Sequence, residues 1–171
     1  EIIVVDDASR DGTRAKISEL QQNGRNVRMF ERTEERGLCS AVLRGFNEAQ
    51  GDYLVCMDAD LSHPPEKLPE LVGALQNDRA EMVVGSRYVP GASTDEDWGF
   101  FRLLNSRIAT FLARPFTTIN DPRAGFFAIP RPVYQRTHNW DPIGYKIGLE
   151  ILVKAECRRV QEVPIHFADR R

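Results

Sequence analysis

The sequence has few cysteines, little net charge and no long apolar run, and each shortage excludes a class of protein. Cys39, Cys56 and Cys157 are its three cysteines, far apart and in no metal-ligand spacing. They argue against a zinc site and a disulfide framework, so we expect buried free thiols, as in a reducing compartment. The formal net charge is −2, which favours neither nucleic acid nor an anionic membrane as a partner. No stretch approaches the about 18 apolar residues of a membrane span, and no signal peptide is visible.

The remaining composition is that of an ordinary globular domain. With 171 residues the chain suits one domain with a substantial core, and 42% hydrophobic and 28% charged residues are usual fractions. The chain opens inside an apolar strand and ends without a closing helix. We therefore expect a single domain over residues 1–171 that is a piece of a longer polypeptide.

The strongest local signal is an apolar run, residues 53–57, that stops at Asp58-Ala59-Asp60. Such a run is typical of a buried strand in a parallel sheet, and open α/β sheets bind ligands at the carboxyl ends of their strands. Residues two apart on an extended chain point to the same side. Asp58 and Asp60 could therefore face one hard divalent cation shared with substrate phosphates. The alternative is that they form a turn or cap the helix expected near Pro65.

A second strand also ends in acidic residues. Residues 1–5 are apolar after the first position and run into Asp6 and Asp7. Two strands that end in acidic clusters, each followed by a helix, form the pattern that a nucleotide-diphosphate site needs.

Apolar periodicity predicts an α/β fold with the order β-α-β-α-β-α-β in the first half, and hence a mostly parallel sheet with right-handed crossovers. The predicted strands are 1–5, 26–30, 53–57 and 82–87, and the helices are 13–23, 37–50 and 66–77. Asp11 or Thr13 would cap the first helix.

The second half is less regular. Residues 89–99 suit a surface loop, either idle or a mobile lid. Helices are predicted over 100–112, 131–137 and 144–154, and strands over 125–129 and 160–167, where Pro164 places the last strand at an edge.

The motifs carry a resemblance to a known family. The strings IIVVDDASRDGT, MDADLSHPP, VVGSRY, DPRAGFFAIPR, GYKIGLEILVK and EVPIHFADR stand in the order found in family 2 glycosyltransferases. The closest likeness is to the dolichyl- or polyprenyl-phosphate mannosyltransferase branch. The resemblance implies a GT-A fold, Mg²⁺ or Mn²⁺, a nucleotide-sugar donor (GDP-mannose or a UDP-sugar) and a lipid-phosphate acceptor at the cytoplasmic face of a membrane. It also implies peripheral membrane contact or membrane segments in the parent protein, leaves a homo-oligomer open and involves no nucleic acid.

The chain departs from the family at both ends. Family members usually begin with one more strand, which ends in a Pro-x-Tyr-Asn-Glu-like motif, and continue into a Gly-x-Ser-Lys-like segment. Neither motif is present here.

The resemblance assigns the donor side of the site. Asp60 is implied as the metal ligand, and Asp58, beside Ala59, contacts the ribose or shares the metal. Ser62 is either near the metal or a turn hydroxyl, and His63 is expected to be a turn residue rather than a ligand.

The nucleotide is assigned to the other acidic strand end. One of Asp6 and Asp7 bonds the base and the other orients the loop. Arg36 and Gly37 open a helix whose N-terminus favours phosphate, although a solvated Arg36 is equally open.

Three cations are implied to act with Asp60 in catalysis: Arg87, Arg107 and Arg170. A guanidinium binds phosphate by a two-pronged bond. Arg102 and Arg107 point in different directions on one predicted helix, so only one is expected to face the acceptor. Asp121 either orients the acceptor region or forms a turn before Pro122.

The implied reaction is inverting transfer of a hexose to a polyprenyl phosphate. Such a phosphate is already ionised at neutral pH and needs no strong general base, which fits three histidines in no convincing base position. The alternatives are a related transferase that uses UDP-glucose or an amino sugar, a non-catalytic nucleotide-sugar-binding domain, and a flavodoxin-like or receiver-like module. Finally, Glu150 among apolar neighbours needs a partner. Lys146, four residues before it, could form a surface pair with it, although a lysine before its glutamate is the weaker order.

Overall fold

In the computed structural model, the described residues are 1–77, 80–95, 117, 119–141, 144 and 146–168. The helix expected over 100–112, with Arg102 and Arg107, lies outside them, as does Arg170. In the first half the elements are β1 (Ile2–Asp6), α1 (Thr13–Gln22), β2 (Val27–Glu31), α2 (Leu38–Glu48), β3 (Tyr53–Cys56), η1 (Pro65–Lys67), α3 (Leu68–Asn77) and β4 (Met82–Ser86). The predicted alternation of strands and helices is confirmed. Neither Asp11 nor Thr13 is the N-cap of α1, which is Gly12 without a side-chain cap bond, but the Asp11 carboxylate accepts a hydrogen bond from the amide of Thr13, the first residue of the helix, at 3.1 Å.

The second half has short elements. They are β5 (Ser93–Thr94), β6 (Phe127–Pro130), α5 (Arg131–Tyr134), α6 (Ile147–Lys154), β7 (Val160–Pro164) and β8 (His166–Phe167). The expected loop over 89–99 therefore contains a strand, since β5 pairs with β8. Glu150 finds the partners that it needs in Lys154 and the Asp141 amide, at 2.8 and 2.6 Å. A glutamate before its lysine is the favourable order on a helix.

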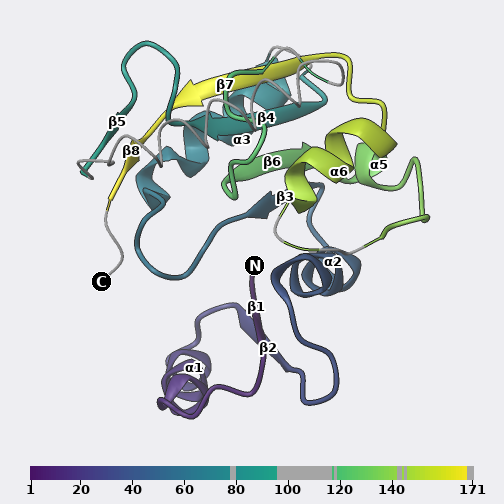
Figure 1. Cartoon of the computed structure of the whole chain (residues 1–171). Coiled ribbons are helices and arrows are strands. Elements are labelled where there is room, and N and C mark those ends of the chain that lie inside the picture. Colours follow the sequence, from purple (N-terminus) through teal and green to yellow (C-terminus); the bar gives the residue numbers. More distant parts are fainter. Residues whose placement is uncertain (78–79, 96–116, 118, 142–143, 145, 169–171) are drawn as a thin grey trace.

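The described strands form one four-stranded sheet and two separate two-stranded pairs, β1–β2 and β5–β8 (Figure 1). β1 and β2 are a parallel pair, and the four-stranded sheet has the order β3-β6-β4-β7. The α/β class is confirmed, but β6 lies antiparallel between β3 and β4, so consecutive strands of the chain are not neighbours. The α3 crossover carries the chain past one strand position, and β6 fills that position from the opposite direction. β7 pairs with β4 alone among the described strands, so Pro164 does lie in an edge strand.

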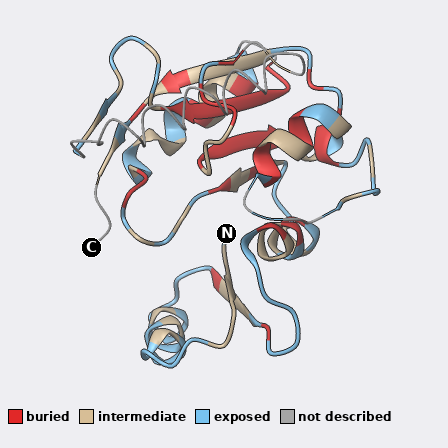
Figure 2. Ribbon diagram, in the orientation of Figure 1, coloured by how far each residue is buried: buried red, intermediate tan, exposed pale blue. Residues whose placement is uncertain are grey.

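β6 is the centre of the hydrophobic core. Phe126, Phe127, Ala128 and Ile129 are all 0% exposed, and successive side chains of a strand point to opposite faces. Phe127 and Ile129 pack in the cluster formed with α2, α5 and α6, and the other two pack with α3. Figure 2 shows buried residues concentrated in this sheet, whereas α1 has none. Burial of each phenylalanine or isoleucine side chain contributes about 1.5–3 kcal/mol, so packing around β6 is a main source of stability for the four-stranded sheet.

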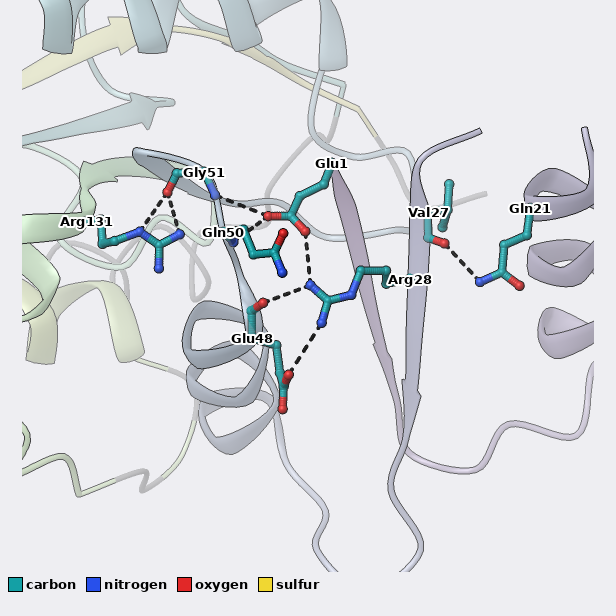
Figure 3. Close-up of polar contacts among 8 residues, drawn as sticks. All are labelled: Glu1, Gln21, Val27, Arg28, Glu48, Gln50, Gly51 and Arg131. Carbon is teal, nitrogen blue, oxygen red and sulfur yellow. Dashed lines mark hydrogen bonds and ion pairs between the residues drawn. The ribbon is translucent and has the colours of Figure 1, made fainter. Parts of the chain in front are cut away.

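Polar contacts tie the β1–β2 pair to the turn between α2 and β3 (Figure 3). The carboxylate of Glu1 accepts hydrogen bonds from the amides of Gln50 and Gly51 and pairs with Arg28. Arg28 also donates to the carbonyl of Glu48 at 2.9 Å. The Gln50 amide and Arg28 hold the pKa of Glu1 below its usual value, against the opposing effect of burial. These contacts hold the turn that leads into β3.

All three cysteines are buried free thiols, as expected. Burial raises the pKa of Cys56 to about 12 and that of Cys157 to about 11. Such thiols are inert at neutral pH.

Candidate active site

The loop after β3 is shaped by its own side chains. One carboxylate oxygen of Asp60 accepts hydrogen bonds from the amide of Ser62, at 3.1 Å, and from its hydroxyl. Leu61 has a φ of 64°, a left-handed conformation rare for a branched residue, and such strain concentrates at functional sites. Neither Asp58 nor Asp60 caps the next helix, since η1 has Pro64 at its N-cap and no side-chain bond. Ser62 is the turn hydroxyl, one of its two expected roles.

His63 holds the start of this loop. Its Nδ1 accepts a hydrogen bond from the Asp58 amide at 3.1 Å, and its ring stacks on Phe126 at 5.2 Å between centroids. The side chain is 4% exposed. Burial lowers the pKa of His63, although the carboxylates of Asp58 and Asp60 act in the opposite direction. His63 does lie in a loop, as expected, but the Pro-Pro context gave no sign of its burial or its bond to Asp58.

The loop before β6 reaches the same carboxylate. A Cβ atom placed on Gly125 would lie 3.4 Å from Oδ2 of Asp58 and 3.4 Å from Cε1 of His63. These separations are those of van der Waals contact, so the backbone at Gly125 lies close to both side chains. Two loops far apart in the chain therefore meet at Asp58.

The acidic end of β1 repeats the turn chemistry of the Asp60 loop. Asp6 accepts hydrogen bonds from the amide and the hydroxyl of Ser9, at 2.8 and 2.6 Å, and Ala8 has a φ of 59°. Which of Asp6 and Asp7 would bond a base stays a prediction, but Asp6 clearly orders its own loop.

Asp7 joins the β1 loop to the start of α2. Its Oδ2 accepts from the Gly37 amide at 2.9 Å, and Oδ1 pairs with the guanidinium of Arg32 at 2.5 Å. Burial opposes ionisation of Asp7, but the Gly37 amide and Arg32, aided by Arg36, outweigh it and hold the pKa below its usual value. The residue is thus an anion that anchors the N-terminus of α2. Arg36 itself is exposed, and the binding of phosphate by Arg36 and Gly37 stays a prediction.

Arg32 is a buried cation that sequence reasoning missed. It is 8% exposed, and besides Asp7 it donates to the Ser40 hydroxyl at 2.7 Å and the Gly37 carbonyl at 3.0 Å. Its position in a run of charged residues, 31–36, made it look like part of a solvated loop.

Arg87, at the end of β4, is held by Asp121. Nε and Nη2 of the guanidinium bind the two carboxylate oxygens of Asp121 at 2.8 and 2.9 Å, and the Arg87 amide donates to the same carboxylate at 3.2 Å. Asp121 is 1% exposed, and such two-pronged charged pairs are strong and directional. Asp121 therefore orients the Arg87 side chain and is not merely a turn residue before Pro122.

Aromatic rings complete the surroundings of Arg87. Its guanidinium carbon lies 5.1 Å from the ring centre of Phe167 and 5.4 Å from that of Tyr88. The Ala168 amide donates to the Ser62 carbonyl at 3.1 Å, which ties the end of β8 to the acidic loop. The residues that follow β3, β4 and β8 thus lie close together. We call this region, which contains Asp58, Asp60, Arg87 and Asp121, the corner. Arg107 and Arg170 lie outside the described residues, so their assigned roles stay predictions.

The carboxylates at the corner are the type of ligand that a hard divalent cation prefers. Asp58 and Asp60 offer carboxylate oxygens, and the Asp58 side chain is 29% exposed and so can be approached. Within the described part of the chain, no group of three or more His, Cys, Asp or Glu residues could hold a metal. A Mg²⁺ or Mn²⁺ ion would therefore need oxygens from a diphosphate and water, as is usual for Mg²⁺ at nucleotide sites.

Comparison with known proteins identifies the family. Residues 1–136 match the model of "Glycosyl transferase family 2", and the chain belongs to this family. It is 48% identical over 170 residues to a dolichol-phosphate mannosyltransferase of Mycosarcoma maydis, and 45% identical over 177 residues to one of Saccharomyces cerevisiae. The matches cover 98% and 99% of this chain but 58% and 66% of those relatives, so the chain spans less than two thirds of their length.

A solved structure shares the fold. Glucosyl-3-phosphoglycerate synthase from Mycobacterium tuberculosis, crystallised with Mn²⁺, UDP-glucose and phosphoglyceric acid, aligns with a TM-score of 0.65 over 99% of this chain and 59% of its own. The identity is 19%, so this likeness supports the GT-A architecture alone.

Proposed function

We propose that the protein transfers a mannosyl group from GDP-mannose to a dolichyl or polyprenyl phosphate, with inversion and with a divalent metal. The names and identities of the curated relatives support the sugar and the acceptor. The observation in this chain that carries the proposal is that the acidic loop after β3 and the fixed guanidinium of Arg87 share one neighbour. The centre of the Phe167 ring lies 5.5 Å from that of His63, in the acidic loop, and 5.1 Å from the guanidinium carbon of Arg87.

We assign the donor and the acceptor to different sides of β6. β3, which leads to Asp58, is an edge strand of the four-stranded sheet, and Figure 1 shows α2 and β1 below it. Asp6 ends β1, and Asp7 accepts a hydrogen bond from the Gly37 amide at the start of α2, so we propose that these residues serve the β3 side. Arg87 follows β4, on the other side of β6. The nucleotide is therefore assigned to the side of β1 and α2, and the acceptor phosphate to the side of Arg87.

Each residue then has one task. Asp58 and Asp60 would hold the Mg²⁺ or Mn²⁺, which when bound would neutralise charge on the departing diphosphate. Arg87 binds the acceptor phosphate and, held by Asp121, keeps it in line with the anomeric carbon. The acceptor phosphate attacks as an anion, so no side chain has to remove a proton from it. Arg107 and Arg170 are proposed as further phosphate-binding cations.

A lipid acceptor requires contact with a membrane, which we place at the cytoplasmic face. Among the described residues, no helix has the length and apolar character of a membrane span. Contact with that membrane, either through the surface around the acceptor side or through membrane segments of the parent protein, is part of the proposal, and self-association stays a prediction.

A second candidate is a transferase of the same family with a UDP-sugar donor. The solved relative bound to UDP-glucose shows that this architecture accepts such a donor. The base preference separates the two candidates, because the catalytic corner would be the same.

The first experiment is calorimetric titration of GDP, and in parallel UDP, in Mn²⁺ and then in EDTA. We expect metal-dependent binding of GDP that Asp60→Asn abolishes. Asp11→Asn is the matched control, because Asp11 bonds the amide and hydroxyl of Thr13 just as Asp60 bonds those of Ser62. Transfer of labelled mannose to a polyprenyl phosphate then tests the reaction. Equal binding with and without metal, or tighter binding of UDP, would contradict the proposed donor site.

A further inference from the structure

Glu162, on the edge strand β7, holds the loop that carries Asp121. Its Oε2 accepts hydrogen bonds from the amide and the side-chain nitrogen of Asn120, at 2.8 and 2.9 Å. Its Oε1 accepts from the amide of Asp121 at 3.0 Å. One carboxylate therefore receives three hydrogen bonds from two consecutive residues of a loop that precedes β6.

These bonds continue to the guanidinium of Arg87. The Asp121 carboxylate receives Nε and Nη2 of Arg87, so the contacts run from Glu162 through Asn120 and Asp121 to Arg87. Glu162 and Arg87 are both held by the paired strands β7 and β4. Glu162 of β7 is in register with Val84 of β4, and Arg87 follows Val84 by three residues. The loop between them is fixed to the sheet by the Glu162 carboxylate.

We propose that Glu162 is a positioning residue for Arg87. This rests on the proposed function, in which Arg87 binds the acceptor phosphate. Side chains that act in catalysis work best when neighbouring hydrogen bonds fix them on rigid elements. Without Glu162, Asn120 and Asp121 lose three bonds, Asp121 is no longer held beneath Arg87, and the phosphate is displaced from the in-line position.

The carboxylate form of residue 162 is essential to this role. Glutamine has one oxygen in place of two, and its NH₂ group would face the donors of Asn120 or Asp121. Glu162→Gln therefore keeps the size of the side chain but cannot accept all three hydrogen bonds.

If Glu162 had only a structural role, its substitution would lower stability without affecting the acceptor site. Glu81 serves as a control for such a role. Glu81 also accepts hydrogen bonds from consecutive amides, those of Arg158 and Arg159 at 2.8 and 3.0 Å. It directly precedes β4 and so lies at the opposite end of that strand from Arg87. Glu81→Gln should therefore destabilise the fold by weakening hydrogen bonds of the same kind, without changing the position of Arg87.

The kinetic test compares both variants in mannosyl transfer from GDP-mannose to a polyprenyl phosphate. We expect Glu162→Gln to raise the KM for the lipid phosphate about tenfold, since small displacements of reacting groups are costly, and to leave the KM for GDP-mannose unchanged. Glu81→Gln should change neither. Asn120→Ala removes only the hydrogen bond from the Asn120 side chain to Glu162 and should raise the acceptor KM by a smaller factor. It replaces Glu162→Gln in the test if that variant folds poorly. An unchanged acceptor KM in both Glu162→Gln and Asn120→Ala would overturn the proposal.

A double-mutant cycle tests whether the effect acts through Arg87. Arg87→Lys removes the two-pronged geometry, so adding Glu162→Gln to it should raise the acceptor KM little further. Fully additive effects would show that Glu162 acts by another route and would overturn the proposal.

A measurement without turnover separates this inference from the proposed function. In the wild-type protein the Arg87 Nε–H, bonded to Asp121, should exchange slowly with water in ¹⁵N NMR, and Glu162→Gln should accelerate that exchange at least tenfold while Glu81→Gln does not. Unchanged exchange in Glu162→Gln would refute the positioning role even in an active enzyme. Absence of mannosyl transfer by the wild type would refute the proposed function but leave this test intact.

Discussion

The imidazole of His63 accepts a hydrogen bond from the backbone amide of Asp58, at 3.1 Å, while its ring stacks on Phe126. A buried aromatic side chain thereby fixes the first carboxylate of the proposed metal site. The bond and the stacking are separable. Phenylalanine preserves the ring but not the acceptor, and asparagine preserves an acceptor near the position of Nδ1 but not the ring.

We therefore predict that His63→Phe weakens metal-dependent GDP binding more than His63→Asn does. An unpaired amide costs about 1–3 kcal/mol, and the Asp58 loop is expected to shift to satisfy it. Calorimetry in Mn²⁺ measures the binding, and thermal unfolding measures the stability. If the asparagine variant binds worse than the phenylalanine variant, packing rather than the hydrogen bond holds the loop.

The ion pair of Arg87 and Asp121 leads to a prediction about stability. Arg87→Ala leaves a carboxylate that is 1% exposed without its cation, and breaking a buried pair in this way costs about 3–5 kcal/mol. The double variant Arg87→Ala/Asp121→Ala removes both charges and should be less destabilised than the sum of the single variants. Urea denaturation measures all three. Additive losses would show that the two side chains do not depend on each other.

The low pKa of Glu81 leads us to predict that the protein loses stability in acid. The hydrogen bond from Arg136, with the amides of Arg159 and Arg158, lowers the pKa of Glu81 to about 2, against the opposing effect of burial. Because the folded-state pKa is depressed, the stabilisation is complete above the ordinary glutamate pKa, near 4.5, and is lost as the pH falls from there towards 2.

Glu81→Gln should accordingly lower the free energy of unfolding at pH 7 by about 1–2 kcal/mol, since the 40% exposed side chain of Arg136 is partly screened by solvent. The difference from the wild type should shrink as the pH falls below 4.5. Urea denaturation across this range measures it, and a difference that stays constant down to pH 2.5 would contradict the assignment to Glu81.

Two glycines on neighbouring elements should respond in opposite directions to alanine. A Cβ atom on Gly85, in β4, would lie 2.6 Å from Cδ1 of Phe126, so Gly85→Ala should destabilise by about 1–3 kcal/mol through overpacking. On Gly73, within α3, the nearest atom would be 4.0 Å away, on Asn77, and Gly73→Ala should stabilise by about 0.5–1 kcal/mol. Thermal unfolding of the two variants tests the packing, and an equal response would show that β6 lies less close to β4.

The sequence by itself determined the features that depend on neighbours along the chain. Hydrophobic periodicity showed the alternation of strands and helices, the turn residues marked the acidic ends of β1 and β3, and the scattered cysteines indicated buried thiols. These signals are local, because helix and strand periods and turn geometry are set within a few residues.

Only the tertiary structure decided which of these pieces meet. No periodicity reveals that β6 enters between β3 and β4, yet that insertion brings Asp121 to Arg87, 34 residues away in the chain. Arg32 stands in a run of charged residues and nothing in the sequence marks Glu162, so their bonds to Asp7 and to the Asn120 loop are evident only in the folded chain. The sequence does not distinguish a polar side chain that faces water from one that bonds a buried partner. Only the packing of the sheet decides which of these environments a side chain has.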